Sequence, residues 1–152
     1  MDGAVETMAA VEADAVTDHD SRAAKSAFRS LLGLRIVEWQ PDVCVVEIPM
    51  RDALRNFSGA AAGPVVAAAV DMAAAQAGCY MPGPGPTRRA VTLSFTVSFV
   101  APGTGGIIRA RGVKIGGGNS IFTSTVTVTD GSGLTLATGQ GTFRYVTLKE
   151  VA

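Results

Sequence analysis

The stretch from Asn56 to Cys79 constrains the fold of this chain more than any other, because it is a long tract of small apolar residues. It reads NFSGAAAGPVVAAAVDMAAAQAGC and contains a single acidic side chain. Pro64 suits the first position of a helix, where its missing N–H costs nothing, and Gly78 is typical of a helix end. The sequence therefore predicts a helix from Pro64 to Ala77.

Asp71 is the acidic residue of this predicted helix. Apolar side chains surround the helix axis, so we expect the helix to be buried on nearly every side and Asp71 to lie inside. Burial without a partner would raise the pKa of the carboxyl group until it became protonated. An acid in such surroundings indicates a partner or a chemical role, which makes Asp71 the first candidate functional residue.

Composition places the chain among globular proteins of one domain, with 152 residues, 47% hydrophobic and 17% charged. Residues 1–20 are acidic and lack a long apolar core, so we expect a disordered tail there and a single domain over residues 21–152. Thirteen basic and thirteen acidic residues give no net charge, which argues against nucleic-acid binding. The tract from Ala60 to Met81 contains Asp71 and Gln76, which favours a buried helix over a membrane span.

The chain has one histidine, His19, and it lies in the N-terminal tail. This excludes Ser-His and Cys-His nucleophile pairs, HExxH zinc sites and a hydratase that depends on histidine. Cys44 and Cys79 lack the spacing of metal ligands and lie in apolar segments, which favours free thiols in a reduced, cytoplasmic protein without metal or cofactor. Any acid–base chemistry must then come from carboxylates.

Six extended segments surround the tract, two before it and four after it. A short helix from Ser21 to Leu32, capped by Asp20 or Ser21 and ended by Gly33, is expected before them. The Pro/Gly segment MPGPGPTRR is expected to be an exposed loop. The predicted strands are Leu34 to Trp39, Val43 to Met50, Val91 to Phe99, Ile107 to Lys114, Ser120 to Thr129 and Leu134 to Leu148.

Short Gly-rich turns join the last four predicted strands, which indicates an antiparallel meander. The pattern predicts an α+β fold in which an antiparallel sheet of about six strands wraps around the apolar helix. In Val91–Phe99, alternation should place the odd-numbered apolar residues on the core and Thr92 on the polar face. We attribute Trp39, Phe95 and Phe99 to the core or to an interface rather than to a substrate site.

The order of elements and the central tract resemble the hotdog fold, and more narrowly the PaaI-type acyl-CoA thioesterases. That family has Asn, two residues, Gly, two residues, His-Gly-Gly, and an acid eight residues after the first glycine of the triplet. Asn56, Gly59, Ala62-Gly63-Pro64 and Asp71 stand at this spacing. The segments AVTLSFTVSFVAPGTG, VKIGGGNS and GLTLATGQGTFRYV resemble the strands that follow, and the resemblance covers residues 28 to 147.

The triplet departs from the family pattern, since Ala62 stands where most members carry histidine and Pro64 replaces the second glycine. A subset of the family has a small residue followed by Gly-Pro, so we interpret the change as a variant of the family. The substitution removes any hydrogen bond that the histidine would supply.

The resemblance implies a thioester hydrolase whose catalytic carboxylate is Asp71, acting as a general base or as a nucleophile through an anhydride. The N–H at Gly63 would bind the thioester oxygen, Asn56 would hold the water or the acyl carbonyl, and Thr92 would position the water. From the residues alone, Gly63 marks a tight helix start, Asn56 a turn, and Thr92 an ordinary strand residue.

Arg88, Arg89 and Lys114 are candidates to bind the phosphates of coenzyme A, which is here part of the substrate, although solvated surface charge explains each of them too. Hotdog relatives build their sites between two subunits, so the resemblance implies a homodimer, or two dimers paired into a tetramer. Pairing of sheet edges would also cover an exposed edge.

Three other functions remain open from the sequence. A hydratase or dehydratase of the same fold usually needs a histidine in its site, and this chain has none there. A non-catalytic protein that binds acyl-CoA or another hydrophobic ligand is favoured by the missing triplet histidine, but a pure binder gains nothing from a buried acid at Asp71. The last alternative is an oligomeric hotdog scaffold without either activity.

Overall fold

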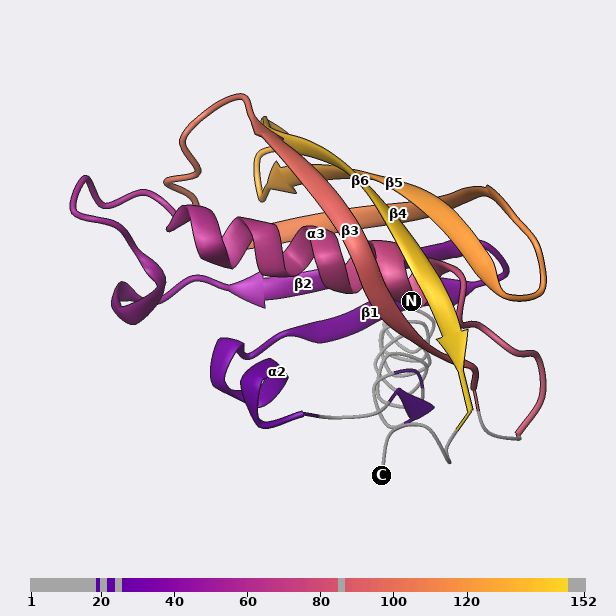
Figure 1. Ribbon diagram of the computed structural model, residues 1–152. Helices are drawn as coiled ribbons and strands as arrows, with labels where there is room; N and C mark the ends of the chain where they lie inside the picture. The colour runs from indigo at the N-terminus through magenta and orange to yellow at the C-terminus, as the bar shows by residue number, and fades with distance from the viewer. Residues whose placement is uncertain (1–18, 20–21, 24–25, 85–86, 148–152) are drawn as a thin grey trace, which may run out of the picture.

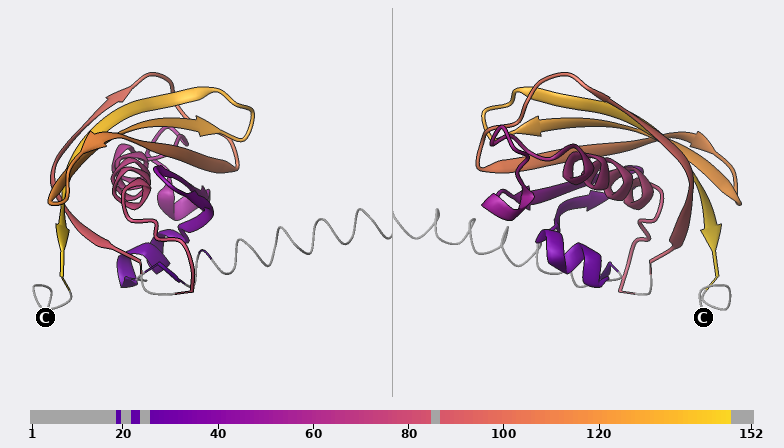
Figure 2. Two further views of the ribbon diagram at one scale, coloured as in Figure 1. Left: turned by 90° about the vertical axis from the view of Figure 1, so that its right-hand side faces the viewer. Right: turned by 60° about the vertical axis from the view of Figure 1, so that its left-hand side comes forward.

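The computed structural model of the chain describes residues 19, 22–23, 26–84 and 87–147. A six-stranded antiparallel sheet curves around one long helix, α3 (Gly63–Ala77), which confirms the predicted α+β hotdog architecture (Figures 1 and 2). The remaining elements are α2 (Ala27–Leu32), η1 (Asp52–Leu54), β1 (Arg35–Gln40), β2 (Val43–Pro49), β3 (Arg89–Phe99), β4 (Ile107–Gly117), β5 (Ile121–Asp130) and β6 (Thr135–Val146).

Helix α3 begins at Gly63, one residue before the predicted start, and ends at Ala77 with Gly78 as its C-cap. Its side chains facing the sheet are buried, but those on the opposite side are only half-buried. The expectation of burial on nearly every side is therefore wrong for the single chain, because the sheet covers only one side of the helix (Figure 2). Ala67, Ala68, Asp71, Met72, Ala75 and Gln76 make up most of the half-buried side.

Small residues let helix α3 lie very close to the sheet. A Cβ atom added to Gly112 of β4 would stand 2.2 Å from the carbonyl oxygen of Ala73, which belongs to the helix backbone. A Cβ atom at Gly139 of β6 would stand 2.6 Å from a methyl group of Val70. The Ala-rich helix and the glycines of the strands therefore fit together at backbone distance, and this fixes the position of the helix over the sheet.

The strands lie in the order β1-β2-β4-β5-β6-β3, and all neighbours are antiparallel. The predicted meander holds for β4, β5 and β6, but it is wrong for β3, which pairs with β6 instead of β4. The connection from β3 to β4, residues 100–106, must therefore cross the end of the sheet beside the start of α3 (Figure 1), and we call it the crossing loop. Backbone hydrogen bonds hold it there, from Ala61 N–H to the Gly103 carbonyl at 2.8 Å and from Val100 N–H to the Leu136 carbonyl at 2.7 Å.

Strand β3 is an edge strand with a bulge that changes which side chains face the helix. Thr92 pairs with Phe143 and Ser94 pairs with Thr142, so Leu93 is an extra residue with no partner position. Directly paired residues lie on the same face of a sheet, and Phe143 is completely buried in the core. Thr92 therefore faces the helix, and the predicted placement of Thr92 on the opposite, polar face is wrong.

The N-terminal part of the chain agrees less well with the predicted boundaries. Helix α2 has Ser26 as its N-cap, so the predicted start at Ser21 is wrong, while its end before Gly33 is as predicted. The expected tail, residues 1–20, lies outside the described residues except for His19. Both cysteines are free and buried. Within the described residues, no helix combines the length and apolar character that a membrane crossing requires.

The close fit of helix and sheet predicts that Gly112→Ala destabilises the protein by about 1–3 kcal/mol, because the new methyl group would overlap the backbone of Ala73. Gly116→Ala on the same strand is the matched control, since a Cβ atom there meets nothing within 4 Å. Urea unfolding of both variants would test this. Equal free energies of unfolding for the two variants would contradict it.

Candidate functional site

Asp71 lies on the half-buried side of α3. The bulged part of the edge strand β3 approaches it there. The hydroxyl group of Thr92 donates a hydrogen bond to its carboxylate, with 2.7 Å between Oγ1 and Oδ1. Burial raises the pKa of Asp71 above its ordinary value, and the hydrogen bond from Thr92 lowers it in part. The structure thus brings these two predicted site residues together, and the bulge at Leu93 is what turns Thr92 toward the acid.

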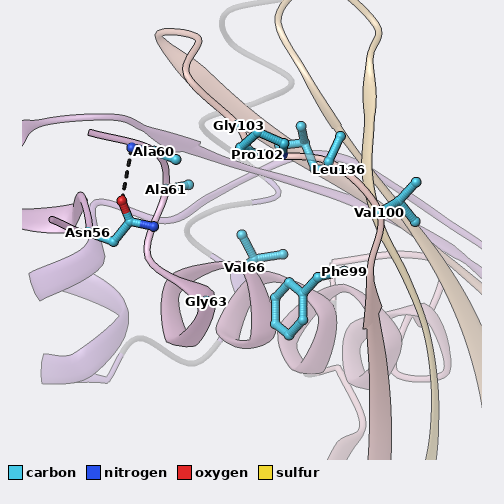
Figure 3. A pocket seen from close by; sticks show the side chains of 11 residues that line it. Asn56, Ala60, Ala61, Gly63, Val66, Phe99, Val100, Pro102, Gly103 and Leu136 are labelled. Atoms are coloured by element: carbon cyan, nitrogen blue, oxygen red, sulfur yellow. Dashed lines mark hydrogen bonds between the residues drawn. The ribbon is translucent and has the colours of Figure 1, made fainter. Parts of the chain in front are cut away.

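Asn56 holds the loop that precedes α3 through one end of its side chain. Its Oδ1 accepts hydrogen bonds from the backbone N–H groups of Ser58 at 2.9 Å and Ala60 at 3.1 Å. Gly59 closes the turn with a positive φ of 78°, a conformation that glycine adopts without strain. The acceptor of Asn56 is therefore occupied, and its Nδ2 donor points toward the neighbouring pocket (Figure 3).

Gly63 provides the first N–H of α3. Val65 and Val66 direct their N–H groups to the carbonyl of Ala62, and Pro64 has none. No hydrogen bond recorded among the described residues uses the N–H of Gly63. The start of a helix carries a partial positive charge, so this N–H is suited to bind a negatively charged oxygen.

A cavity of about 330 Å³ lies at the start of α3, and both Asn56 and Gly63 line it (Figure 3). Its other walls come from the start of the helix, the end of β3, the crossing loop and β6. They are Ala60, Ala61, Val66, Phe99, Val100, Ala101, Pro102, Gly103 and Leu136.

The predicted site residues form two groups on one chain. Asn56 and Gly63 share the cavity at the start of α3, whereas Asp71 and Thr92 do not line it. Asp71 follows Gly63 by eight residues, which is about 12 Å along a helix. One chain therefore holds an oxygen-binding group and a carboxylate that are too far apart to reach the same carbonyl group.

Two of the three predicted cations lie together. Arg88 and Arg89 line a second cavity of about 210 Å³ with Gln76 and the beginning of β3. The guanidinium of Arg88 lies 3.5 Å from the ring centre of Tyr145, which fixes its direction. Lys114 does not line this cavity. Its Nζ lies 3.7 Å from the Oδ1 of Asp42, at the turn between β1 and β2.

Among the cavity-lining residues that sequence reasoning missed are Gln76 and Phe99. Gln76 could have been found, because it is the only other polar side chain of the apolar helix. Phe99 gave no such signal, since its alternation with polar residues equally predicts a core position. Trp39 is in the core with 2% of its surface exposed, but Phe95 and Phe99 are 40% and 60% exposed, so they are not core residues of the single chain.

Comparison with known proteins gave no matching protein-family model and no matching curated protein. Solved structures do match. The phenylacetic acid degradation protein PaaI from Thermus thermophilus, solved as a point mutant, is 27% identical, with 78% of this chain and 98% of that chain covered and a TM-score of 0.66.

Two further structures match at lower identity. A thioesterase from Haemophilus influenzae is 20% identical, with 88% of this chain and 91% of that chain covered and a TM-score of 0.75. The PaaI protein from the phenylacetic acid degradation operon of Escherichia coli is 18% identical, with 81% and 86% covered and a TM-score of 0.70. These two matches show the fold. The chain is therefore a hotdog-fold protein, and its similarity is to the PaaI-type thioesterases.

Proposed function

We propose that this protein is an acyl-CoA thioesterase that hydrolyses the thioester of a small aryl- or fatty-acyl-CoA. The observation that carries the proposal is a partly buried carboxylate, Asp71, held by Thr92 on a helix whose first N–H is unused. Hydrolysis of a thioester needs these two elements, an anion that activates or attacks and a donor for the carbonyl oxygen. The similarity to structures named thioesterase supports the same activity.

The active site is composed of two copies of the chain. The donor at Gly63 and the carboxylate of Asp71 are about 12 Å apart on one helix, so a second copy must supply one of them. Strand β3 leaves its outer edge open and exposes Val91, Leu93, Phe95 and Phe99. A long apolar edge of this kind favours pairing with another strand. The protein is thus a homodimer, or a dimer of dimers, built on β3.

Antiparallel pairing of two β3 strands about a two-fold axis places the end of one strand beside the beginning of the other. The cavity with Asn56 and Gly63 lies at the end of β3, next to Phe99, while Thr92 and Asp71 lie near its beginning. Pairing therefore brings the oxygen-binding cavity of one copy to the carboxylate of the other, and it does so twice in each dimer.

The proposed role of each group in the reaction follows from the atoms that it has available to donate a hydrogen bond. The N–H of Gly63 and the Nδ2 of Asn56 donate to the thioester oxygen as it becomes negative. Because the Oδ1 of Asn56 already accepts two hydrogen bonds from its own loop, the side chain donates to the carbonyl through Nδ2 rather than accepting a hydrogen bond from the attacking water. It supplies a donor in a site where Ala62 replaces the histidine of most relatives.

Asp71 acts either as the base that takes a proton from the water that attacks the carbonyl carbon, or as the nucleophile that attacks this carbon and forms an anhydride, which water then hydrolyses. In both routes the C–S bond breaks and coenzyme A leaves as the thiolate. Thr92 orients the carboxylate. Arg88 and Arg89 lie at a cavity near the beginning of β3 and bind the phosphates of coenzyme A. A cytoplasmic location belongs to this proposal and is consistent with two buried free thiols.

The second candidate function is non-catalytic binding of acyl-CoA or another hydrophobic ligand. One observation favours it, namely that Ala62 leaves the site without the histidine of most relatives. Such a protein would use the cavity at the start of α3 without any need for Asp71.

A thiol-release assay over a panel of acyl-CoA thioesters separates the two functions. We expect Asp71→Asn to lower kcat/KM by about 100-fold or more, because the substitution removes the carboxylate and keeps its shape. Asp52→Asn is the control, since the side chain of Asp52 is fully exposed. Full activity of Asp71→Asn would remove Asp71 from the mechanism, and absence of thiol release by the wild type would favour the binding protein.

The pH profile tests the role of Thr92. Only the ionised form of Asp71 is active, so kcat/KM should rise with pH through the pKa of Asp71. The hydrogen bond from Thr92 lowers this pKa, and Thr92→Val should therefore move the rising limb to higher pH, while Thr92→Ser keeps it in place. A limb that does not move in Thr92→Val would show that the hydroxyl group does not act on the carboxylate.

A further inference from the structure

Gln76 carries the only side-chain amide of the apolar helix α3. The residue is half-buried and lines the cavity of about 210 Å³ near the beginning of β3. Its backbone carbonyl accepts a hydrogen bond from the indole N–H of the core residue Trp39 at 2.8 Å, which fixes the helix at this point. No hydrogen bond recorded among the described residues uses its side-chain amide. The amide of Gln76 is therefore held in place and available to a ligand.

The cavity that Gln76 lines combines two cations with uncharged walls. Arg88 and Arg89 supply the cations, and no acidic residue of the described chain lines the cavity to neutralise them. Arg88 is directed by the ring of Tyr145 and by a hydrogen bond that it donates to the carbonyl of Asn119 at 3.3 Å. The remaining lining residues are Thr87, Ala90, Val91 and Val146. Such a cavity suits a ligand that is anionic at one end and has uncharged polar groups beside that end.

The position of Gln76 falls between Asp71 and these cations. Gln76 follows Asp71 by five residues, which is about 7.5 Å along a helix. Arg89 precedes Thr92, the hydrogen-bond partner of Asp71, by three residues, which is about 10 Å along a strand. An acyl-CoA has the same order, because the two secondary amides of its pantetheine arm lie between the sulfur and the phosphates. With the thioester at Asp71 and the phosphates at the arginines, an amide of the arm passes Gln76.

We propose that the side-chain amide of Gln76 binds an amide of the pantetheine arm and so selects coenzyme A thioesters over thioesters of simple thiols, an inference that rests on the proposed acyl-CoA thioesterase function. A side-chain amide can donate to the carbonyl or accept from the N–H of another amide, and it adds no charge. A carboxylate at the same place would pair with Arg88 or Arg89 and compete with the phosphates. Gln76 is not part of β3, so the pairing of two β3 strands does not use its backbone.

Two thioesters of the same acyl group separate this role from a structural one. Hexanoyl-pantetheine carries both amides, whereas the hexanoyl thioester of mercaptoethanol carries neither, and both lack phosphates. Gln76→Met keeps the length of the side chain and removes its amide, so the ratio of kcat/KM for the first thioester to kcat/KM for the second should fall by about 3- to 10-fold, the effect of one lost hydrogen bond.

A structural defect in Gln76→Met would lower both values of kcat/KM and leave their ratio unchanged, and an unchanged ratio would overturn the proposal. Gln140→Met is the matched control, since Gln140 is exposed on β6 and does not line the cavity. Its ratio should stay at the wild-type value.

Binding separates a failure of this proposal from a failure of the proposed function. Calorimetry with coenzyme A, and with the adenosine bisphosphate that remains when the pantetheine arm is removed, needs no hydrolysis. If the wild type released no thiol from any thioester, the thioesterase function would fail while these two affinities still tested Gln76. Weaker binding of coenzyme A by Gln76→Met with unchanged binding of the bisphosphate supports the proposal. An equal loss of both affinities would place Gln76 at the phosphates and contradict it, as would two unchanged affinities.

Discussion

The hydrogen bond between Thr92 and Asp71 is the interaction on which the account of this protein depends. It joins the edge strand to the central helix at the one acidic residue of that helix. Burial disfavours the charged form of Asp71, and the hydroxyl group offsets part of that effect. The hydrogen bond thus favours the ionised form of the carboxylate in surroundings where a charge is effective, since an electrostatic interaction is stronger in a low dielectric medium.

Because of the geometry of helix α3, a single chain supplies only half of the groups that one proposed active site needs. An N–H at the first residue of a helix and a carboxylate eight residues later cannot act on the same atom, because an α-helix separates them by about 12 Å. The exposed apolar edge of β3 offers the means to combine two halves, and the unpaired backbone of that edge favours the same contact. Assembly and catalysis therefore share one structural element in the proposed enzyme.

The sequence predicted the parts of the fold that depend on local patterns. Pro64 and Gly78 marked the ends of the helix within one residue, and extended runs bounded by turn residues, with alternation clearest in Val91–Phe99, marked all six strands. The position of β3 beside β6 could not be predicted, because it depends on contacts between segments far apart in the chain. The bulge at Leu93 was missed for the same reason, and with it the true orientation of Thr92.

The candidate site was predictable to the extent that a sequence pattern fixes spacing. The spacing of the family pattern singled out Asn56 and Gly63, and in the structure both residues line one cavity. The occupied Oδ1 of Asn56 and the pairing of Lys114 with Asp42 were not predictable, since both depend on three-dimensional contacts. Phe99 was assigned to the core or an interface, because a sequence does not tell which apolar face of an edge strand stays open.

Activity of mixed dimers tests most directly whether the site is composed of two chains. Asn56→Ala and Asp71→Asn each damage both sites of their own homodimer, and unfolding and refolding them together forms mixed dimers. In such a dimer one site has both substitutions and the other has neither, so an equal mixture should recover about a quarter of the wild-type activity. A mixture that remains as inactive as its two components would contradict the shared site.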